Sequence, residues 1–520
     1  MKALPSAVLG GLAIAISSAT MAGTQPYFNP LTQSSAVASP NHVNELTSPW
    51  RKPAGVAETN LTNMAKIEAD MDQSVVRVPG LTSSASMWDM VAFDPTGQYI
   101  FIPHETMTGA GVTRYDIAAD HAETLFSGDA SGNWASDFGA FDPARITPYG
   151  TLILGEEWSG EGRVIEVLNP YADPADIQVR EKTSFANVSQ EGIGFSKHYG
   201  DTVYYIDEDK SGSIYKLVAS DEEFNHGQTF VLSVVAYNGD ASQNYNASSN
   251  AGATRTGAAV WTPLTDKDGN PLTAQDPFEN NGSFRAGRIA ADQAGATPFG
   301  RPEDVEVGTL ANGNEVLYFT ATSEQAIYSV EMTDKDHATV RIFASEDDTP
   351  KNLGFPATTA HLNSPDNLAQ DAFGNIYVVE DAPNGSDVGG DIWFIRDADG
   401  NGVAESIDHF LSLQVNGAES TGMIFNPVKP TEFVVSVQHP SSTNQDNVPG
   451  GQGDSLWKFD ITDVVPPTCE HGHYNEVSYA KGRFITTCSS DYDFNYVRKL
   501  KQTVKQDRDH DHHWHWRWHH

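Results

Sequence analysis

One sequence pattern occurs six times along the central part of this 520-residue chain. Each copy begins with a polar or acidic cluster, continues through a short strand and a turn, and ends in a hydrophobic strand that runs into acidic or polar residues. The distance from Glu105 to Glu156 is 51 residues, and the distance from Glu156 to Asp207 is again 51. Repeats of this length are typical of four-stranded blades, so the sequence predicts an all-β fold, a six-bladed β-propeller with long inserted loops. The copies cover residues 87–105, 136–157, 189–209, 301–324, 364–381 and 417–440.

The acidic clusters at the starts of these copies are expected to meet. In a propeller the innermost strands begin around one central channel, so equivalent positions from different blades converge. Several carboxylates gathered without an equal number of basic side chains repel one another unless cations lie among them. The pattern therefore predicts a cluster of hard cations, and capping of strands or loops by some of these side chains is the alternative. The expected channel-lining residues are Glu105, Glu191, Glu303, Asp366, Asn367 and Glu419.

The segment Arg301-Pro302-Glu303 places a guanidinium and a carboxylate two positions apart. In an extended chain that spacing puts both side chains on one face, and a proline favours extended geometry in the residue before it. Such a pair could hold a metal and an anion together. A salt bridge at a strand end is the alternative reading of this motif.

Two groups of consecutive acids follow predicted strands. Glu156 and Glu157 are adjacent, so on a regular strand only one of them faces the channel, although a bulge would relax this limit. Asp207 and Asp209 share one face, and Glu208 takes the other. The pattern alone leaves open which set points inward.

Composition excludes some partners. The chain has 32 basic and 69 acidic residues, which gives a formal net charge of −37. This charge repels nucleic acid and anionic lipid headgroups, so neither is an expected partner. It suits either a soluble protein that works in salty surroundings or one that carries many carboxylates for divalent cations.

The N-terminus has the pattern of a Sec-type secretory signal, with Lys2, an apolar run and small residues up to Ala22. No other apolar run is long enough to span a bilayer, so we expect an exported, periplasmic or secreted monomer. Export favours a disulfide between the two cysteines, Cys469 and Cys488. The expected organisation is a signal peptide (1–22), an extended arm (23–70), the propeller (71–465), a C-terminal extension with the cysteine pair (466–500) and a disordered tail rich in His and Trp (501–520).

Several segments within residues 87–440 resemble the PhoX-type alkaline phosphatases, which are exported six-bladed propellers that hydrolyse phosphate esters with an iron and calcium cluster on the axis. The matching segments are TPYGTLILGEE (147–157), QEG (190–192), YYIDEDKSGSIYKLV (204–218), GRIAADQAGATPFGRPEDVEV (287–307), NSPDNLAQD (363–371) and GAESTG (417–422) followed by VQHP (437–440). The resemblance implies that Arg301 contacts substrate phosphate. It also implies a set of metal ligands: Glu156, Glu191, Asp207 and Glu303, with Glu157 and Glu208 as further candidates.

The chain departs from the family pattern at the iron ligands. Gly155 stands where the family has a cysteine before Glu-Glu, so an iron–thiolate bond cannot form there. Gln190 stands where the family pattern has a histidine before Glu-Gly. All-oxygen ligands favour calcium or magnesium, so we expect calcium rather than iron as the cofactor.

A separate segment resembles a calcium-binding loop. Oxygen-bearing side chains fall at positions 1, 3, 5, 9 and 12, and glycine falls at position 6, as in an EF-hand-type loop. Because the segment follows a predicted strand rather than a helix, a glycine-rich β-turn is an equal alternative. The residues are Asp397, Asp399, Asn401, Glu405 and Asp408.

The expected function is the hydrolysis of small anionic phosphate monoesters by water that calcium activates. One alternative is a non-catalytic calcium-binding propeller that binds an anionic ligand or partner. Another is a calcium-dependent lactonase or esterase, because Ser364-Pro365-Asp366-Asn367 also resembles the channel motif of gluconolactonase-like propellers. The guanidinium of Arg301 beside Glu303 favours an anionic substrate.

Overall fold

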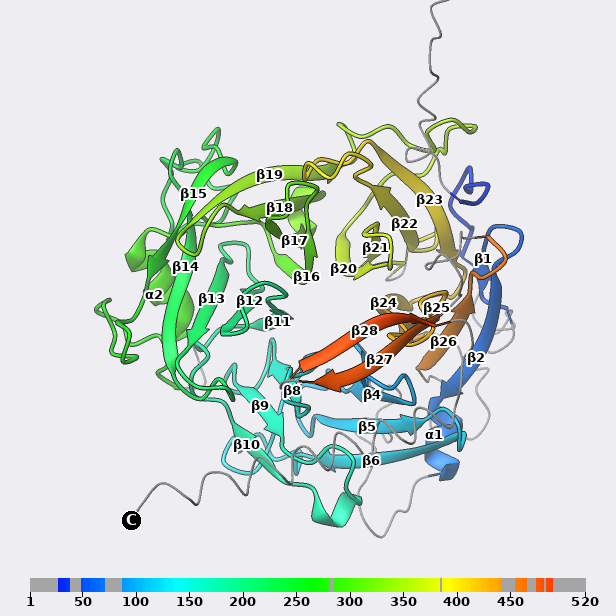
Figure 1. Ribbon diagram of the computed structural model, residues 1–520, viewed down its shortest axis with the longest axis horizontal. Coiled ribbons are helices and arrows are strands. Elements are labelled where there is room, and N and C mark those ends of the chain that lie inside the picture. Colours follow the sequence, from blue (N-terminus) through cyan, green and yellow to red (C-terminus); the bar gives the residue numbers. More distant parts are fainter. Residues whose placement is uncertain are drawn as a thin grey trace, which may run out of the picture.

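The computed structural model describes residues 27–37, 48–70, 87–280, 285–383, 386–440, 454–464, 474–480 and 483–489. Within these residues strands dominate, and the helical elements are α1 (Met64–Asp70), α2 (Ala286–Ala294) and the 3-10 turns η1 (Pro174–Asp176) and η2 (Thr322–Glu324). The sheets stand around a common centre in a propeller-like ring (Figure 1). The all-β class is confirmed.

The ring begins with two antiparallel four-stranded sheets. The first contains β3 (Ala92–Phe93), β4 (Tyr99–Pro103), β5 (Gly111–Asp116) and β6 (His121–Ser127). The second contains β7 (Phe141–Ile146), β8 (Leu152–Glu156), β9 (Val164–Val167) and β10 (Val179–Glu181). Strand β8 is buried at every position, as expected for a strand covered on both faces, whereas β10 on the outside alternates between exposed and half-buried residues.

A nine-stranded sheet follows. Its order is β11 (Gln190–Phe195), β12 (Thr202–Asp207), β13 (Ile214–Ala219), β14 (Gly227–Val234), β15 (Gly257–Pro263), β19 (His337–Ser345), β18 (Ala326–Met332), β17 (Glu315–Ala321) and β16 (Pro302–Thr309). Strand β15 bonds to β14 on one side and to β19 on the other, and so joins two groups of four strands. The described residues therefore do not form six separate sheets, one for each predicted blade.

Two further sheets complete the ring, and each takes its outer strand from the N-terminal part of the chain. One has the order β1 (Trp50–Arg51), β23 (Ser406–Leu413), β22 (Asp391–Arg396), β21 (Ile376–Glu380) and β20 (Pro365–Gln370). The other has the order β2 (Ala57–Asn63), β26 (Ser455–Asp460), β25 (Glu432–Gln438) and β24 (Glu419–Phe425). Residues 57–63, expected to belong to an extended arm, thus form a paired strand.

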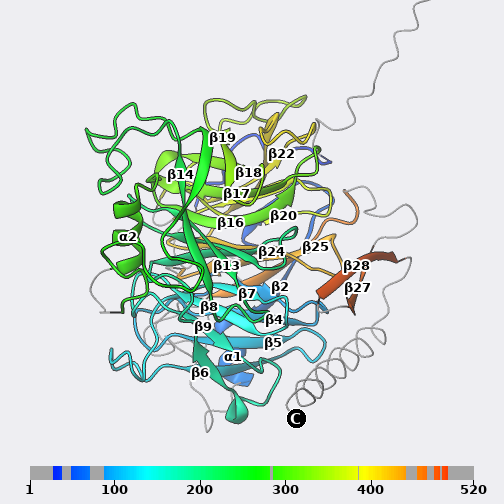
Figure 2. The ribbon, with the colours of Figure 1, turned by 60° about the vertical axis from the view of Figure 1, so that its left-hand side comes forward.

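A hairpin of β27 (Tyr474–Ala480) and β28 (Arg483–Ser489) lies in front of one face of the ring (Figure 1 and Figure 2). Cys469 of the predicted disulfide lies outside the described residues, as do the predicted signal peptide and the His- and Trp-rich tail. The side chain of Cys488 is not described either. No helix among the described residues has the length and apolar character that a membrane crossing requires.

The hydrophobic core lies between neighbouring sheets. Phe433 on β25 stacks on Phe459 of its own sheet at 4.9 Å and contacts Phe410 of the neighbouring sheet at 6.1 Å between ring centroids. Tyr377 on β21 packs against Phe425 on β24 at 5.2 Å. These contacts hold adjacent sheets face to face and fix the positions at which their innermost strands begin.

Four innermost strands, β7, β11, β16 and β20, begin in the same irregular way. In each, the first residue pairs with the neighbouring strand, and the register then shifts at the next positions. The residue before three of them has a left-handed backbone, with φ of 46° at Ala140, 51° at Arg301 and 47° at Ser364. Bulges of this kind re-aim side chains next to functional sites.

The expectation that Pro302 holds Arg301 extended is therefore wrong. Tertiary hydrogen bonds override the local preference: Arg301 N–H donates to the carbonyl of Asp209 at 2.9 Å, and the carbonyl of Arg301 accepts from the N–H of Thr322 at 2.9 Å.

Candidate functional site

The second residue of each of these four strands carries a carboxylate: Asp142, Glu191, Glu303 and Asp366. Ligand-type oxygens of Glu191, Glu303 and Asp366 lie within 4.8 Å of one another. A second group within the same limit contains Asp142, Glu157 and Glu191. Equivalent positions on neighbouring strands therefore converge, as the sequence predicted for Glu191, Glu303 and Asp366.

A third group within 4.8 Å contains Asp89, Glu105 and Asp142. Because Asp142 and Glu191 each belong to two groups, the three groups form one continuous set, which we call the axial acidic cluster. Each member is at most 8% exposed. The cluster consists of Asp89, Glu105, Asp142, Glu157, Glu191, Glu303 and Asp366.

Burial and mutual repulsion make this cluster hold protons when no cation is bound. Burial, followed by the charges of Asp142 and Glu303, raises the pKa of Glu191 well above its usual value. Burial and the charge of Glu419 raise the pKa of Glu105 to about 7. Seven buried carboxylates cannot all be charged without compensation, so the cluster favours either protons or cations.

The donor set fits hard divalent cations. All seven side chains of the cluster offer carboxylate oxygens, which calcium and magnesium prefer. Among the described residues, Asp142 Oδ1 is buried and has no hydrogen-bond partner. A buried carboxylate oxygen without a partner is costly in a protein interior, and a bound cation removes that cost.

Arg301 lies at the edge of the cluster and is about one-third exposed. Its Nε donates to Glu208 at 2.5 Å, and its Nη2 lies 3.2 Å from Glu303. Its Nη1 lies 3.9 Å from Asp381. The guanidinium thus bridges the buried carboxylates and the solvent, and the predicted pairing of Arg301 with Glu303 is present.

The structure resolves which of the consecutive acids face the centre. Glu157 belongs to the cluster, and Glu208 lies on its edge beside Arg301. Burial raises the pKa of Glu157, and the negative charge of Glu208 raises it further. A hydrogen bond from Glu157 and the charge of Arg301 outweigh the burial of Glu208 and lower its pKa.

Glu156 and Asp207, expected as metal ligands, are not brought to the cluster. Glu156 receives two hydrogen bonds from Arg163, at 2.8 and 2.6 Å. Asp207 receives two from Arg288 on α2, both at 2.7 Å. Side chains alternate along a strand, so these carboxylates face away from their inward neighbours, and arginines neutralise them.

The structure also shows why an iron–thiolate bond does not fit at residue 155. A side-chain carbon added to Gly155 would lie 2.6 Å from Cβ of Gln190 and 2.8 Å from the ring of Pro143. Gln190 is itself held by a 2.8 Å hydrogen bond from Nε2 to the carbonyl of Ala186. The space that a cysteine would need is filled.

The remaining channel candidates have structural partners. Asn367 Oδ1 accepts a hydrogen bond from Thr421 Oγ1 and another from the N–H of Gly422, and so ties β20 to β24. Glu419 lies 3.3 Å from His439 Nε2. Glu419 and the side-chain hydrogen bond that it makes raise the pKa of His439 to about 9, although burial alone would lower it.

The predicted calcium loop connects β22 and β23 rather than two helices. Oxygens of Asp397, Asp399 and Glu405 lie within 4.8 Å of one another. Asn401 donates to Asp399 at 3.0 Å. Asp408 is fully buried 4.0 Å from Arg396 and is not a member of that close group.

Asp89 and Asp142 belong to the cluster although neither was singled out as a ligand. Asp89 lies shortly before β3, and Asp142 occupies the same second position in β7 as Glu191 occupies in β11. Aligning the six repeats on that position would have found Asp142.

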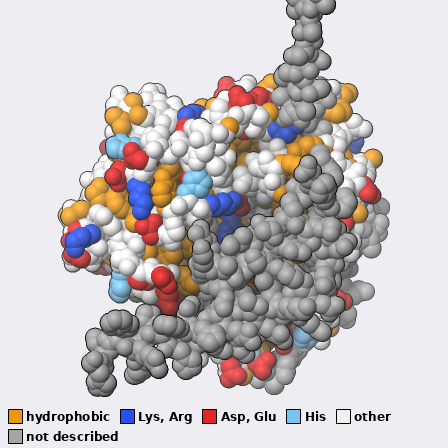
Figure 3. Space-filling view, in the orientation of Figure 1, with side chains coloured by type: hydrophobic (Ala, Val, Ile, Leu, Met, Phe, Trp, Pro, Cys, Tyr) orange, Lys and Arg blue, Asp and Glu red, His pale blue; other side chains and the backbone are white. Residues whose placement is uncertain are grey.

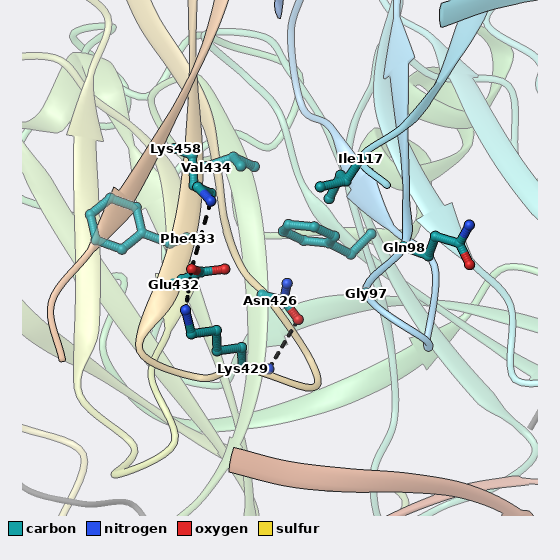
Figure 4. A pocket seen from close by; sticks show the side chains of 10 residues that line it. Gly97, Gln98, Ile117, Asn426, Lys429, Glu432, Phe433, Val434 and Lys458 are labelled. Atoms are coloured by element: carbon teal, nitrogen blue, oxygen red, sulfur yellow. Dashed lines mark hydrogen bonds and ion pairs between the residues drawn. The ribbon is translucent and has the colours of Figure 1, made fainter. Parts of the chain in front are cut away.

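A cavity of about 200 Å³ lies elsewhere, between the sheet of β3–β6 and the sheet of β24–β26. Figure 4 shows Lys429 directed toward Glu432 there, and Lys458 lies 3.7 Å from the same carboxylate. Gly97 and Asn426 border it from the turns that follow β3 and β24. These turns lie at the opposite ends of the strands from the acidic cluster, so the cavity is separate from it.

The part of the molecular face that Figure 3 colours by residue type carries both acidic and basic side chains, scattered among neutral and hydrophobic ones.

Comparisons with known proteins identify a family and a similar solved structure. The family profile for alkaline phosphatase PhoX matches residues 128–441, which is more than half of the chain. The structure of Pseudomonas fluorescens PhoX in complex with vanadate, a transition state analogue, is similar, with a TM-score of 0.57 and 15% identity over 85% of this chain and 100% of that one. A gluconolactonase from Xanthomonas campestris gives a TM-score of 0.37 and 13% identity over 79% and 97% of the two chains. No curated protein matches the chain.

The family profile spans the strands that carry Asp142, Glu191, Glu303 and Asp366, together with Arg301. Phosphatase-like function is therefore supported, and the chain belongs to the PhoX alkaline phosphatase family.

Proposed function

We propose that this protein is an exported, calcium-dependent phosphoesterase that hydrolyses phosphate monoesters at the axial acidic cluster. The observation that carries the proposal is the position of Arg301, which is one-third exposed and borders both Glu208 and Glu303. A positive side chain at the edge of a buried carboxylate cluster offers one binding surface for an anion and another for cations.

Each group has a defined task in this proposal. The guanidinium of Arg301 presents planar N–H donors that match phosphate oxygens, so it binds and orients the substrate. Glu191 and Asp142 each belong to two of the close carboxylate groups, so they are among the residues that would hold bound cations. When bound, the cations would supply positive charge to the phosphate and lower the pKa of water. The burial of the cluster keeps bulk water away and strengthens these charge interactions.

We also infer that the nine-stranded sheet corresponds to two blades joined by β15, which gives six blades in all. Six bridges support this count among the described residues, because each joins the start of an inner strand segment to the end of the next strand. The pairs are Trp88 with His104, Phe141 with Glu156, Gln190 with Asp207, Pro302 with Ala321, Pro365 with Glu380 and Glu419 with Gln438.

The test is hydrolysis of a chromogenic phosphate ester by the exported protein, with calcium, with iron or with a chelator. We expect calcium-dependent turnover that falls at least about 100-fold in Arg301→Ala, because a charged donor to the transferred group is lost. Arg341→Ala is the matched control, because Arg341 pairs with Glu331 on the outer strands at 2.6 Å.

Two results would contradict the proposal. Bound calcium without turnover would favour the non-catalytic propeller. Hydrolysis of a lactone but not of a phosphate ester would favour the lactonase.

A further inference from the structure

Two large apolar side chains lie exposed beside the acidic cluster. Trp158 is 38% exposed and directly follows the cluster residue Glu157, and Met107 is 61% exposed and lies two residues after the cluster residue Glu105. Ser159 Oγ donates to the carbonyl of Met107 at 2.5 Å, so the two segments run side by side. The apolar pair is therefore part of the surroundings of the site.

The indole of Trp158 is fixed at one edge and open at the other. Its Nε1–H donates to the carboxylate of Glu105, which is only 8% exposed. Glu105 Oε2 lies 3.5 Å from Gln438 Nε2, which holds the carboxylate from its other side. Since the nitrogen edge reaches the buried cluster, the exposed part of the ring is the part directed away from it, toward solvent.

The edge of the cluster is thus chemically divided. Toward Glu208 and Glu303 it carries the exposed guanidinium of Arg301, and toward Glu105 it carries the indole. The positive charge of the Arg301 guanidinium would attract the phosphate group of a substrate. The alcohol part of the same ester would then extend toward the remaining surface, and Trp and Met side chains favour flat aromatic groups there.

We propose that Trp158, assisted by Met107, binds the alcohol part of the substrate and selects phosphate monoesters of aromatic alcohols. The inference rests on the proposed function, because it assumes that phosphate binds between Arg301 and the cluster. It adds a specificity-determining residue and a substrate class to that function.

The kinetic test compares phenyl phosphate with glycerol phosphate in the calcium-loaded full-length protein. For Trp158→Ala we expect the ratio of the two kcat/KM values to fall about three- to tenfold, the range for loss of one aromatic contact. Trp158→Phe keeps a ring but loses the N–H donor, so the ratio should stay near that of the unchanged protein. Met107→Ala should lower the ratio in the same direction and by less.

If Trp158→Ala lowers both kcat/KM values equally, the side chain acts only by holding Glu105, and the proposal is overturned. Met107→Ala and Trp158→Phe keep the test decisive if Trp158→Ala does not fold, because Met107 is largely exposed and phenylalanine preserves a ring.

Calorimetric binding of phenylphosphonate and methylphosphonate separates this inference from the proposed function. Tighter binding of phenylphosphonate that is lost in Trp158→Ala supports the inference even if no ester is hydrolysed. Turnover without any preference for the aromatic ester or phosphonate leaves the function standing and overturns the inference. Binding of neither phosphonate also overturns it.

Discussion

Replacing Glu191 by glutamine should stabilise the metal-free protein and weaken its response to calcium. Glu191 belongs to two of the three close carboxylate groups, and its oxygens lie within 4.8 Å of those of its neighbours. Two charges at that distance repel by about 3.5 kcal/mol at an effective dielectric constant of about 20. The free protein avoids this repulsion by keeping protons on the cluster.

The size of the stability change follows from the free-energy cost of keeping Glu191 protonated in the folded protein. Burial and neighbouring charges raise the pKa of Glu191 above its usual 4.5. A carboxyl with a raised folded-state pKa destabilises the fold increasingly as the pH rises above its unfolded value, by about 1.4 kcal/mol per pH unit until it ionises. At pH 8 the cost is at most about 5 kcal/mol, and at pH 5 it is below about 1 kcal/mol.

Glu191→Gln removes this cost and also removes a shared cation ligand. We therefore expect a higher unfolding midpoint than the unchanged protein in chelator at pH 8, and little difference at pH 5. With calcium the advantage of the variant should shrink by up to about 2.7 kcal/mol, because a hundredfold loss of affinity removes that much calcium-dependent stabilisation.

The measurement is thermal and denaturant unfolding at both pH values, with calcium and with chelator. Glu315→Gln is the control, because Glu315 is also buried but accepts hydrogen bonds from Ser196 and Tyr204 at the other end of its strand pair. That variant should lose stability without changing the calcium response. Equal destabilisation by Glu191→Gln at both pH values, or an unchanged calcium response, would refute the reasoning.

Three further predictions concern neighbouring groups. Gly155→Cys should lower the unfolding free energy by about 1–3 kcal/mol through overpacking, and added iron should give no thiolate absorption band. The pKa of His439 is raised to about 9 beside Glu419. The stabilisation from this ion pair is therefore complete below about pH 6.5 and is lost as the pH rises through 9. His439→Gln should abolish this part of the pH dependence of the unfolding free energy. Arg163→Met should cost about 3–5 kcal/mol because it leaves the buried Glu156 carboxylate without its ion-pair partner, and adding Glu156→Gln should recover most of the loss in denaturant unfolding.

These three predictions have distinct contradictory outcomes. A stable Gly155→Cys variant that binds iron would show that the side chains packed around that glycine can move. If His439→Gln leaves the pH dependence of the unfolding free energy unchanged, the ion pair of His439 does not contribute to stability. Failure of Glu156→Gln to rescue Arg163→Met would mean that the arginine acts mainly through packing.

The repeated pattern was sufficient to predict the propeller-like ring and the convergence of Glu191, Glu303 and Asp366, because periodic strands place equivalent positions together. It was not sufficient for Arg301, whose backbone is left-handed instead of extended. The local preference before proline is small, and two tertiary hydrogen bonds outweigh it.

The consecutive acids show where sequence reasoning stops. Alternation along a strand predicts that Glu156 and Glu157 face opposite ways, yet the direction depends on the placement of Arg163. In the same way, Arg288 on α2 pairs with Asp207, and Arg301 pairs with Glu208. Neither arginine is identified as a partner by its position in the sequence.

The sequence by itself determined the all-β class, the family resemblance, the acidic character of the site and the absence of a thiolate at Gly155, since these depend on periodicity and residue identity. Only the tertiary structure decided which of the consecutive acids join the cluster, because tertiary contacts join segments far apart in the chain, as when Arg288 pairs with Asp207. It also decided that Asp89 and Asp142 join the cluster and that Trp158 lies beside it. Whether an arginine or a cation neutralises a given carboxylate depends on the distances between side chains in the folded protein, and the sequence alone does not give these distances.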